Sequence, residues 1–130
     1  MLKGFTLTMW VGFGGFLGSI MRYWVTYGMA KLLGVTFPYG TLLVNLIGCY
    51  LIGLLGTIAT QRIFLTPSLR QQFLFIGILG GFTTFSSFSY EALELFKERS
   101  FLLGSIYIGG HYFFCLLFVW LGYITVLRLY

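Results

Sequence analysis

The sequence predicts an all-α membrane protein with four transmembrane helices. Of its 130 residues, 58% are hydrophobic and only 8% are charged, whereas soluble domains contain about 25% charged residues. Four stretches without Lys, Arg, Asp or Glu are near or above the roughly 20 residues that a helix needs to cross a bilayer. These stretches cover residues 4–21, 32–61, 71–90 and 100–127. Their hydrophobicity is continuous rather than alternating, which favours helices over a β-barrel.

The boundaries of the helices follow from the charged and polar residues between these stretches. Arg22 falls in the last turns of the first helix, where its long side chain can reach the membrane surface. Pro38 precedes the second helix, a position at which proline is tolerated. Residues 1–130 therefore form a single transmembrane domain. The expected spans are 4–30, 39–61, 70–97 and 101–127.

Small residues four positions apart indicate where the helices pack closely. Gly14 and Gly18 form such a pair in the first helix, and Cys49 and Gly53 form another in the second, with Gly56 continuing this small face. Small side chains let helices approach each other where no hydrophobic driving force acts between them. The chain has two cysteines, and their positions inside apolar stretches favour buried thiols over a disulfide or a metal site.

The distribution of charge bears on topology. The net charge of +5 comes from basic residues spread along the chain, which is typical of topology and headgroup anchors rather than of a nucleic-acid surface. If the termini and the 62–70 segment share one side, each side carries four basic residues, and the positive-inside rule gives no orientation. Either the chain inserts both ways and forms an antiparallel, dual-topology homodimer, or other signals set one orientation. The first side holds Lys3, Arg62, Arg70 and Arg128, and the second holds Arg22, Lys31, Lys97 and Arg99.

The third span contains a polar motif at the depth of the membrane. Residues 80–89 read Gly-Gly-Phe-Thr-Thr-Phe-Ser-Ser-Phe-Ser. Glycine is a poor helix former, and Ser and Thr side chains can redirect backbone hydrogen bonds. We therefore expect the third helix to be broken between Gly80 and Thr84, which would free carbonyl oxygens suited to a hard cation such as Na⁺. The alternative is an unbroken helix with a packing face rich in Ser and Thr.

Three groups could interact with a small anion. Phe82, Phe85 and Phe88 share one helical face at a spacing of three, and the positive edges of their rings can lie against an anion; packing or lipid contact is the alternative. Asn45, inside the second span, can donate two hydrogen bonds to an anion or bond to a neighbouring helix. Arg22 can attract anions to a vestibule or serve only as an anchor.

Together these patterns resemble the Fluc/CrcB family of fluoride channels. The resemblance covers essentially the whole chain and rests on three motifs. These are G-G-x-x-G-x-x-x-R-Y at 14–23, G-T-L-x-V-N-x-x-G at 40–48, and G-G-F-T-T-F-S-S-F-S at 80–89. The third is the most specific. Ser87 stands where the family often has Thr, which keeps the hydroxyl, and Ser19 replaces a common Ala.

The resemblance implies a function and an assembly. It implies a passive, highly selective channel in the bacterial inner membrane that exports cytoplasmic fluoride and so reduces fluoride toxicity. It also implies an antiparallel homodimer with two pores, whose partners are fluoride, the lipid bilayer and a second copy of the chain, with no nucleic acid.

The resemblance also assigns roles to residues of this chain. Phe85 and Phe88 would contact fluoride, and Arg22 would lie near the pore entrance. The carbonyls of Gly80 and Thr83 would bind a structural Na⁺ at the dimer interface. The other implied pore residues are Asn45, Thr84, Ser86, Ser87 and Tyr107.

Other classes of protein fit the sequence less well. A proton antiporter of the small multidrug-resistance type needs a carboxylate in its first span, and residues 1–33 contain none. A membrane subunit without transport activity leaves the polarity of 80–89 unexplained, and an enzyme lacks a nucleophile–base pair or metal cluster. We expect Glu91 to belong to a solvated helix end or to line a vestibule. His111 fits a helix contact better than a ligand or a proton relay.

Overall fold

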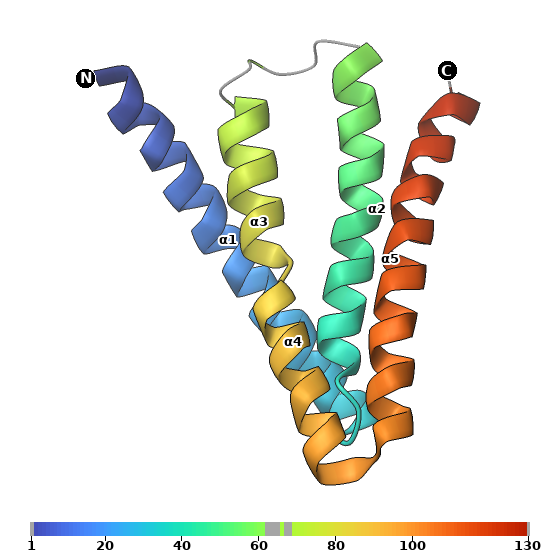
Figure 1. The fold of residues 1–130 in the computed structure, drawn as a ribbon. Coiled ribbons are helices and arrows are strands. Elements are labelled where there is room, and N and C mark those ends of the chain that lie inside the picture. The colour runs from blue at the N-terminus through green and yellow to red at the C-terminus, as the bar shows by residue number, and fades with distance from the viewer. Residues whose placement is uncertain (1, 62–65, 67–68, 130) are drawn as a thin grey trace.

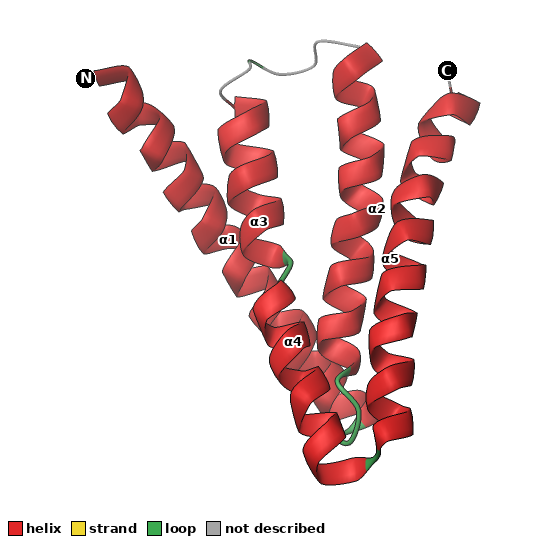
Figure 2. Cartoon of the chain, viewed as in Figure 1, coloured by secondary structure: helices red, strands yellow, loops and turns green. Residues whose placement is uncertain are grey.

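The chain folds into long helices that run up and down, as a computed structural model shows (Figures 1 and 2). The structure describes residues 2–61, 66 and 69–129. Within them, four stretches are long and apolar enough to cross a membrane, which confirms that the chain has four transmembrane helices. They cover residues 4–33, 39–60, 69–98 and 101–129. The elements are α1 (Leu2–Leu33), α2 (Tyr39–Gln61), η1 (Leu69–Leu79), α3 (Gly80–Phe82), α4 (Phe85–Glu94), η2 (Leu95–Arg99) and α5 (Phe101–Leu129).

The third span is broken, as predicted, and the break lies at Thr83 and Thr84. Both residues have extended backbones, with φ −79° and ψ 158° at Thr83 and φ −152° and ψ 120° at Thr84. Before the break, η1 has wide π-helical turns and runs into the short α3. After it, α4 starts a new helix with Thr84 as its N-cap. The break shows in Figure 2 as the short loop between α3 and α4.

The helices form two pairs. One consists of α1 packed on η1 and α3, and the other of α2 packed on α5. The pairs converge at the end that holds η2 and separate towards the end that holds both termini (Figure 1). Some of the predicted small residues make these close contacts. A Cβ at Gly18 would lie 2.8 Å from the Phe82 amide nitrogen, and one at Gly53 would collide with the Val119 carbonyl, whereas Gly56 has nothing within 4 Å.

Because α2 and α5 run in the same direction (Figure 1), residues with one constant separation in sequence face each other on successive turns. Asn45 contacts His111, 66 residues further on, and Gly53 packs against Val119 at the same separation. Pairs four residues apart lie on adjacent turns, so α2 and α5 are in register over several turns. We call this contact the α2–α5 seam. Its pairs are Thr41/Tyr107, Asn45/His111, Cys49/Cys115 and Gly53/Val119.

The predicted position of Arg22 is wrong. Helix α1 continues to Leu33, so Arg22 does not lie in its last turns. Gly18, one turn earlier on the same face of α1, packs against Phe82. Arg22 therefore lies within about one turn, or about 5 Å, of the level at which the third span is broken. Arg22 therefore no longer counts among the basic residues at the helix ends, and three basic residues remain on its side of the membrane against four on the other. One of those four, Arg62, lies outside the described residues.

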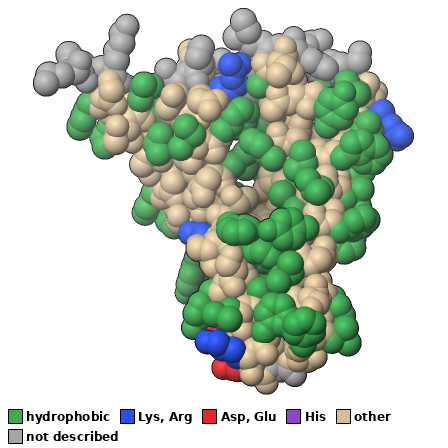
Figure 3. Space-filling view, in the orientation of Figure 1, with side chains coloured by type: hydrophobic (Ala, Val, Ile, Leu, Met, Phe, Trp, Pro, Cys, Tyr) green, Lys and Arg blue, Asp and Glu red, His purple; other side chains and the backbone are tan. Residues whose placement is uncertain are grey.

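The outer surface is apolar along most of its length. Green hydrophobic side chains are spread over the face in Figure 3 among the tan backbone and other side chains, and most of the visible charged groups lie towards its two ends. Large side chains such as Phe16, Trp24 and Phe113 are 60%, 61% and 64% exposed. A surface of this kind is stable against lipid rather than water. The structure thus fits a multi-pass integral membrane protein.

The seam predicts how the two glycines of α2 respond to substitution. Gly53→Ala places a methyl group against the Val119 carbonyl, and overpacking of this kind costs about 1–3 kcal/mol, so we expect a lower midpoint of thermal unfolding in detergent. Gly56→Ala is the matched control, since it adds the same methyl group to the same helix in open space. Equal midpoints for the two variants would show that α2 and α5 do not pack as described.

Candidate functional site

The break in the third span is held by Asn45 of α2. The Asn45 side chain donates from Nδ2 to the Thr84 carbonyl at 3.0 Å and accepts at Oδ1 from the Thr84 amide at 2.9 Å. Both residues are buried, so an unpaired backbone group at this position would be costly. The side-chain amide thus replaces helical hydrogen bonds that the extended backbone cannot make. Of the two roles considered for Asn45, the structure shows the bond to a neighbouring helix.

The same contacts release two carbonyl oxygens. In a continuous helix, the Thr84 amide would donate to the Gly80 carbonyl and the Ser87 amide to the Thr83 carbonyl. Instead the Thr84 amide donates to Asn45 Oδ1, and the Ser87 amide donates to Thr84 Oγ1 at 3.2 Å. Within the described part of the chain, neither carbonyl receives another backbone bond across the break. The break leaves the carbonyls of residues 80–83 without their helical partners, and the two oxygens that the resemblance assigns to Na⁺ are among these four.

Hydroxyl groups gather at the start of α4 around Thr84. Thr84 Oγ1 donates to Ser87 Oγ at 3.0 Å and lies 3.3 Å from Ser86 Oγ. The first amides of a helix have no partners within it, and the helix dipole makes this end partially positive. The N-terminus of α4 thus combines amide and hydroxyl donors near the middle of the membrane-spanning stretch, in a chemistry that suits an anion.

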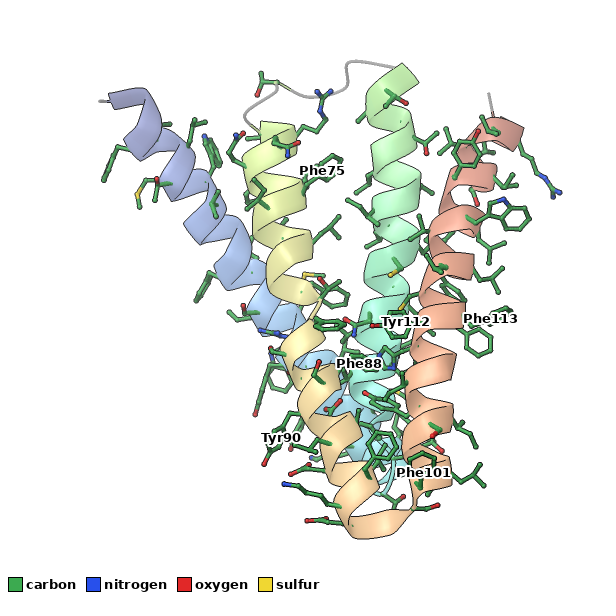
Figure 4. The ribbon with its side chains drawn as sticks, in the orientation of Figure 1. Phe75, Phe88, Tyr90, Phe101, Tyr112 and Phe113 are labelled. Carbon is green, nitrogen blue, oxygen red and sulfur yellow. The ribbon has the colours of Figure 1, made fainter. Side chains whose placement is uncertain are left out.

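The two phenylalanines of the motif lie differently. Phe88 is 5% exposed and packs against the rings of His111 and Tyr107, with centroid distances of 4.3 Å and 5.4 Å. Phe85 is 67% exposed, and its ring lies beside that of Phe88 at a centroid distance of 5.4 Å. Figure 4 shows Phe88 pointing from α4 towards α5, and Phe113 pointing away from the bundle. One ring is therefore fixed in the core, and the other is available to contact a further molecule.

An open cavity lies between the two helix pairs. It has a volume of about 480 Å³ and is lined by Asn45, Thr84, Phe85, Phe88 and both free carbonyl residues, Gly80 and Thr83. His111, Cys49 and Cys115 also line it, from the seam. Phe75 and Tyr112 complete part of its wall (Figure 4). The hollow opens near the middle of the face seen in Figure 3. Asn45 and the residues of the break thus share one space.

Glu91 forms a second polar cluster, below Phe88 on α4. Its carboxylate accepts a hydrogen bond from Thr41 Oγ1 at 2.7 Å and another from the Tyr107 hydroxyl at 2.7 Å. Thr41 and Tyr107 form the seam pair one turn below Asn45 and His111. Both helices of the seam, α2 and α5, therefore contact this carboxylate. Glu91 also lines a separate cavity of about 260 Å³ with Glu94 and Glu98. This position matches a vestibule lining better than a freely solvated helix end.

His111 is buried in the seam. Its Nε2 lies 3.3 Å from Asn45 Nδ2, and because the amide nitrogen can only donate, Nε2 must accept and the ring proton belongs to Nδ1. Within the described residues, this Nδ1 is buried without a hydrogen-bond partner. The imidazole therefore orients the amide that holds the break, which is the helix contact expected from the sequence.

The structure brings most of the predicted residues together. Asn45, Thr84, Phe85 and Phe88 line one cavity; Ser86 and Ser87 join them through the Thr84 hydroxyl. Tyr107 packs under Phe88 and binds Glu91. Arg22 is not among the residues that line the two cavities described above.

Sequence reasoning did not assign a role to Thr41 and left those of Glu91 and His111 open. The usable signal for Thr41 and His111 was their separation along the chain from the facing residue of the other seam helix, a signal that Glu91 lacks. Thr41 and Tyr107, like Asn45 and His111, stand 66 residues apart, and both pairs follow a spacing of four along α2 and α5.

Comparison with known proteins agrees with these features. The family model described as CrcB-like protein, Camphor Resistance (CrcB), matches residues 9–123. A fluoride-specific ion channel FluC from Geotalea daltonii is 40% identical over 114 residues, covering 88% of this chain and 91% of that protein. FluC proteins from Methylocella silvestris and Sorangium cellulosum are 38% and 41% identical, covering 93% and 92% of this chain and 93% and 94% of their own lengths.

The family model spans the first transmembrane helix to the last, and it includes the three motifs and the residues that meet at the break in the third span. The relatives match the chain over nearly all of its length at about the same identity. The chain therefore belongs to the CrcB-like protein family.

Proposed function

We propose that this protein is a passive, selective fluoride channel of the bacterial inner membrane that exports cytoplasmic fluoride and so reduces its toxicity. The relatives named as fluoride-specific ion channels support this. The observation that carries the proposal is the broken third span, whose second half begins with donor groups beside the aromatic rings of Phe85 and Phe88. An ion channel also agrees with the expectation that the chain is not an enzyme.

The chemistry at the break suits a small, strongly hydrated anion. Fluoride must exchange its hydration shell for other donors, and the hydroxyls of Thr84, Ser86 and Ser87 together with the α4 N-terminus offer several. The edges of Phe85 and Phe88 add weaker electrostatic contacts. Conduction requires binding strong enough for the ion to enter and weak enough for it to leave. Many weak donors in sequence meet this requirement better than one fixed cation.

Asn45 acts in this scheme by holding the donors in place. Both hydrogens of its amide are directed to Thr84 and His111, so its first role is to fix the break. A pore role that includes direct donation to fluoride requires one of these contacts to exchange with the ion. We propose that the Asn45–His111 contact is the exchangeable one, because its 3.3 Å is longer than the 3.0 Å contact to Thr84.

We further propose an antiparallel, dual-topology homodimer with two pores and a structural Na⁺ at its centre. The near-balance of basic residues between the two sides supports insertion both ways. Gly80 is exposed at the break, and a two-fold axis beside it would bring the free carbonyls of Gly80 and Thr83 from both copies together. Such oxygens suit Na⁺, and the cation would neutralise the partial negative charges of the carbonyls. The exposed ring of Phe85 would be covered by the second copy. By symmetry, the Phe85 ring of each copy would lie in an equivalent position at one of the two pores.

Transport by the purified protein in liposomes tests the function. We expect fluoride loaded inside to leave rapidly down its gradient, as followed with a fluoride electrode, and chloride to remain. A passive channel has no coupling, so an imposed proton gradient should not drive fluoride against its own gradient. Absence of fluoride flux, or equal chloride flux, would overturn the proposal.

One observation favours a second candidate, a proton-coupled fluoride transporter. Glu91 is a carboxylate within a membrane span, and such groups often carry protons. Its two short hydrogen bonds, to Thr41 and Tyr107, instead suggest a fixed acceptor that orients the two hydroxyls. Glu91→Gln separates the possibilities within the same liposome assay. If a proton gradient drives fluoride uphill and Glu91→Gln abolishes this movement, the protein is a proton-coupled transporter and the proposal of a passive channel is wrong.

Two substitutions test the pore assignment. In Asn45→Asp, a carboxylate replaces the amide that donates to the Thr84 carbonyl, so we expect fluoride flux to fall by at least tenfold. Phe85→Ile removes a ring edge and should lower flux as well. Phe113→Ile is the matched control, because this ring is 64% exposed and points away from the bundle. Unchanged flux in both test variants, measured on protein that elutes and melts like the original, would exclude the pore residues proposed.

Labelling of the chain in cells tests dual topology. A cysteine added after the last residue of a Cys49→Ala/Cys115→Ala background should react with a membrane-impermeant maleimide in about half of the copies, because half of the C-termini would face outwards. Complete labelling before lysis, or labelling only after lysis, would show one orientation. Cross-linking of the purified protein tests the assembly, and we expect dimers.

A further inference from the structure

The two cysteines of the chain face each other across the α2–α5 seam. Cys49 and Cys115 have the same separation as the contacting pair Asn45 and His111, so they occupy facing positions one turn further along the seam. Both are partly exposed, and both line the 480 Å³ cavity. The sequence alone favoured two inert buried thiols, but the structure brings the only two sulfhydryl groups of the chain together at the wall of an open space.

The neighbouring turns hold the two thiols in place. One turn below, Asn45 Nδ2 lies 3.3 Å from His111 Nε2. One turn above, the α2 backbone at Gly53 lies directly against the α5 backbone at Val119. Because contacts fix α2 and α5 on both sides of the cysteines, the two helices hold the cysteine backbones in facing positions. The pair is therefore preorganised, which lowers the entropic cost of binding one ligand between them.

The number and kind of donors select the ligand. In the part of the chain that the structure describes, no group of three or more His, Cys, Asp and Glu could hold a metal ion, so a four-coordinate Zn²⁺ site is not supported. Two sulfur atoms suit a soft cation that takes two ligands in a line. With a divalent ion such as Hg²⁺, two thiolates give an adduct without net charge, and an uncharged group costs far less than a charged one in an apolar cavity.

We propose that Cys49 and Cys115 form a two-thiol site that captures one soft, two-coordinate cation and bridges α2 to α5. Each thiol releases a proton to water and forms one sulfur–metal bond. No electrons are transferred, so no oxidant or reductant is needed. The bound cation lies in the cavity one turn from Asn45. If the proposed channel function is correct, it obstructs the space beside the break and stops fluoride.

Titration of the purified full-length protein with HgCl₂ tests the site directly. Intact-mass spectrometry should show one mercury added per chain with the loss of two protons, and neither thiol should then react with a maleimide. Uptake of two mercury ions per chain, or one remaining reactive thiol, would overturn the bridge. This readout does not depend on transport.

Variants of the cysteines identify the site. Cys49→Ser and Cys115→Ser each leave one thiol, and we expect a competing small dithiol to remove mercury from both at concentrations at least 100-fold lower than from the original protein. The double variant Cys115→Ala/Phe114→Cys is the matched control, because it keeps two thiols but moves one to an outward-facing neighbouring position. Retention of mercury by this control equal to that of the original protein would mean that facing geometry plays no part.

Fluoride flux provides the functional readout. One equivalent of HgCl₂ should lower the flux of the original protein at least tenfold, and excess dithiothreitol should restore it. In Cys49→Ser/Cys115→Ser, mercury should leave the flux at the level that this variant shows without mercury. Bridged mercury with undiminished flux would overturn the obstruction. Flux that is absent before mercury is added would instead contradict the channel function and leave the mass measurement as the test of the site.

Discussion

The pair of hydrogen bonds between Asn45 and Thr84 is the interaction on which the rest of the site depends. An extended backbone inside a membrane leaves amides and carbonyls without helical partners, and the surrounding hydrocarbon cannot satisfy them. A side-chain amide has one acceptor and two donors in a planar arrangement, so a single asparagine can satisfy both the amide and the carbonyl of Thr84. The break is therefore stable because α2 supplies what the third span lacks.

The seam between α2 and α5 carries this arrangement to the neighbouring turns. Parallel helices in constant register present their facing residues as a series of pairs. Each pair has a distinct chemistry: Thr41 with Tyr107 binds the Glu91 carboxylate, Asn45 with His111 holds the break, and the two cysteines face the cavity. The close approach at Gly53 fixes the register for all of them. A change that shifted α5 by one residue would therefore disturb every polar group of the site at once.

The sequence predicted those features that depend on composition along a single helix. Long uncharged stretches determine the spans, and the glycines and hydroxyls of 80–89 determine where the third one breaks. It could not reveal the partner of Glu91 or the contact between Asn45 and His111, because these depend on how two distant helices are rotated and shifted against each other. Arg22 was misplaced for a related reason: one arginine near the end of an expected span looks like an anchor at the membrane surface, whereas α1 continues to Leu33 and Gly18, one turn before Arg22, packs at the level of the break.

The break separates two kinds of polar group. The carbonyls of Gly80 and Thr83, released before α4 begins, are partially negative, and the amides and hydroxyls at the start of α4 are partially positive. Breaking one helix thus creates acceptors and donors a few residues apart, without any formal charge in the membrane. A cation and an anion can each find suitable partners there. Because no side chain at the break itself carries a charge, anions are attracted without being bound permanently, which is the electrostatic condition that a passive pore has to meet.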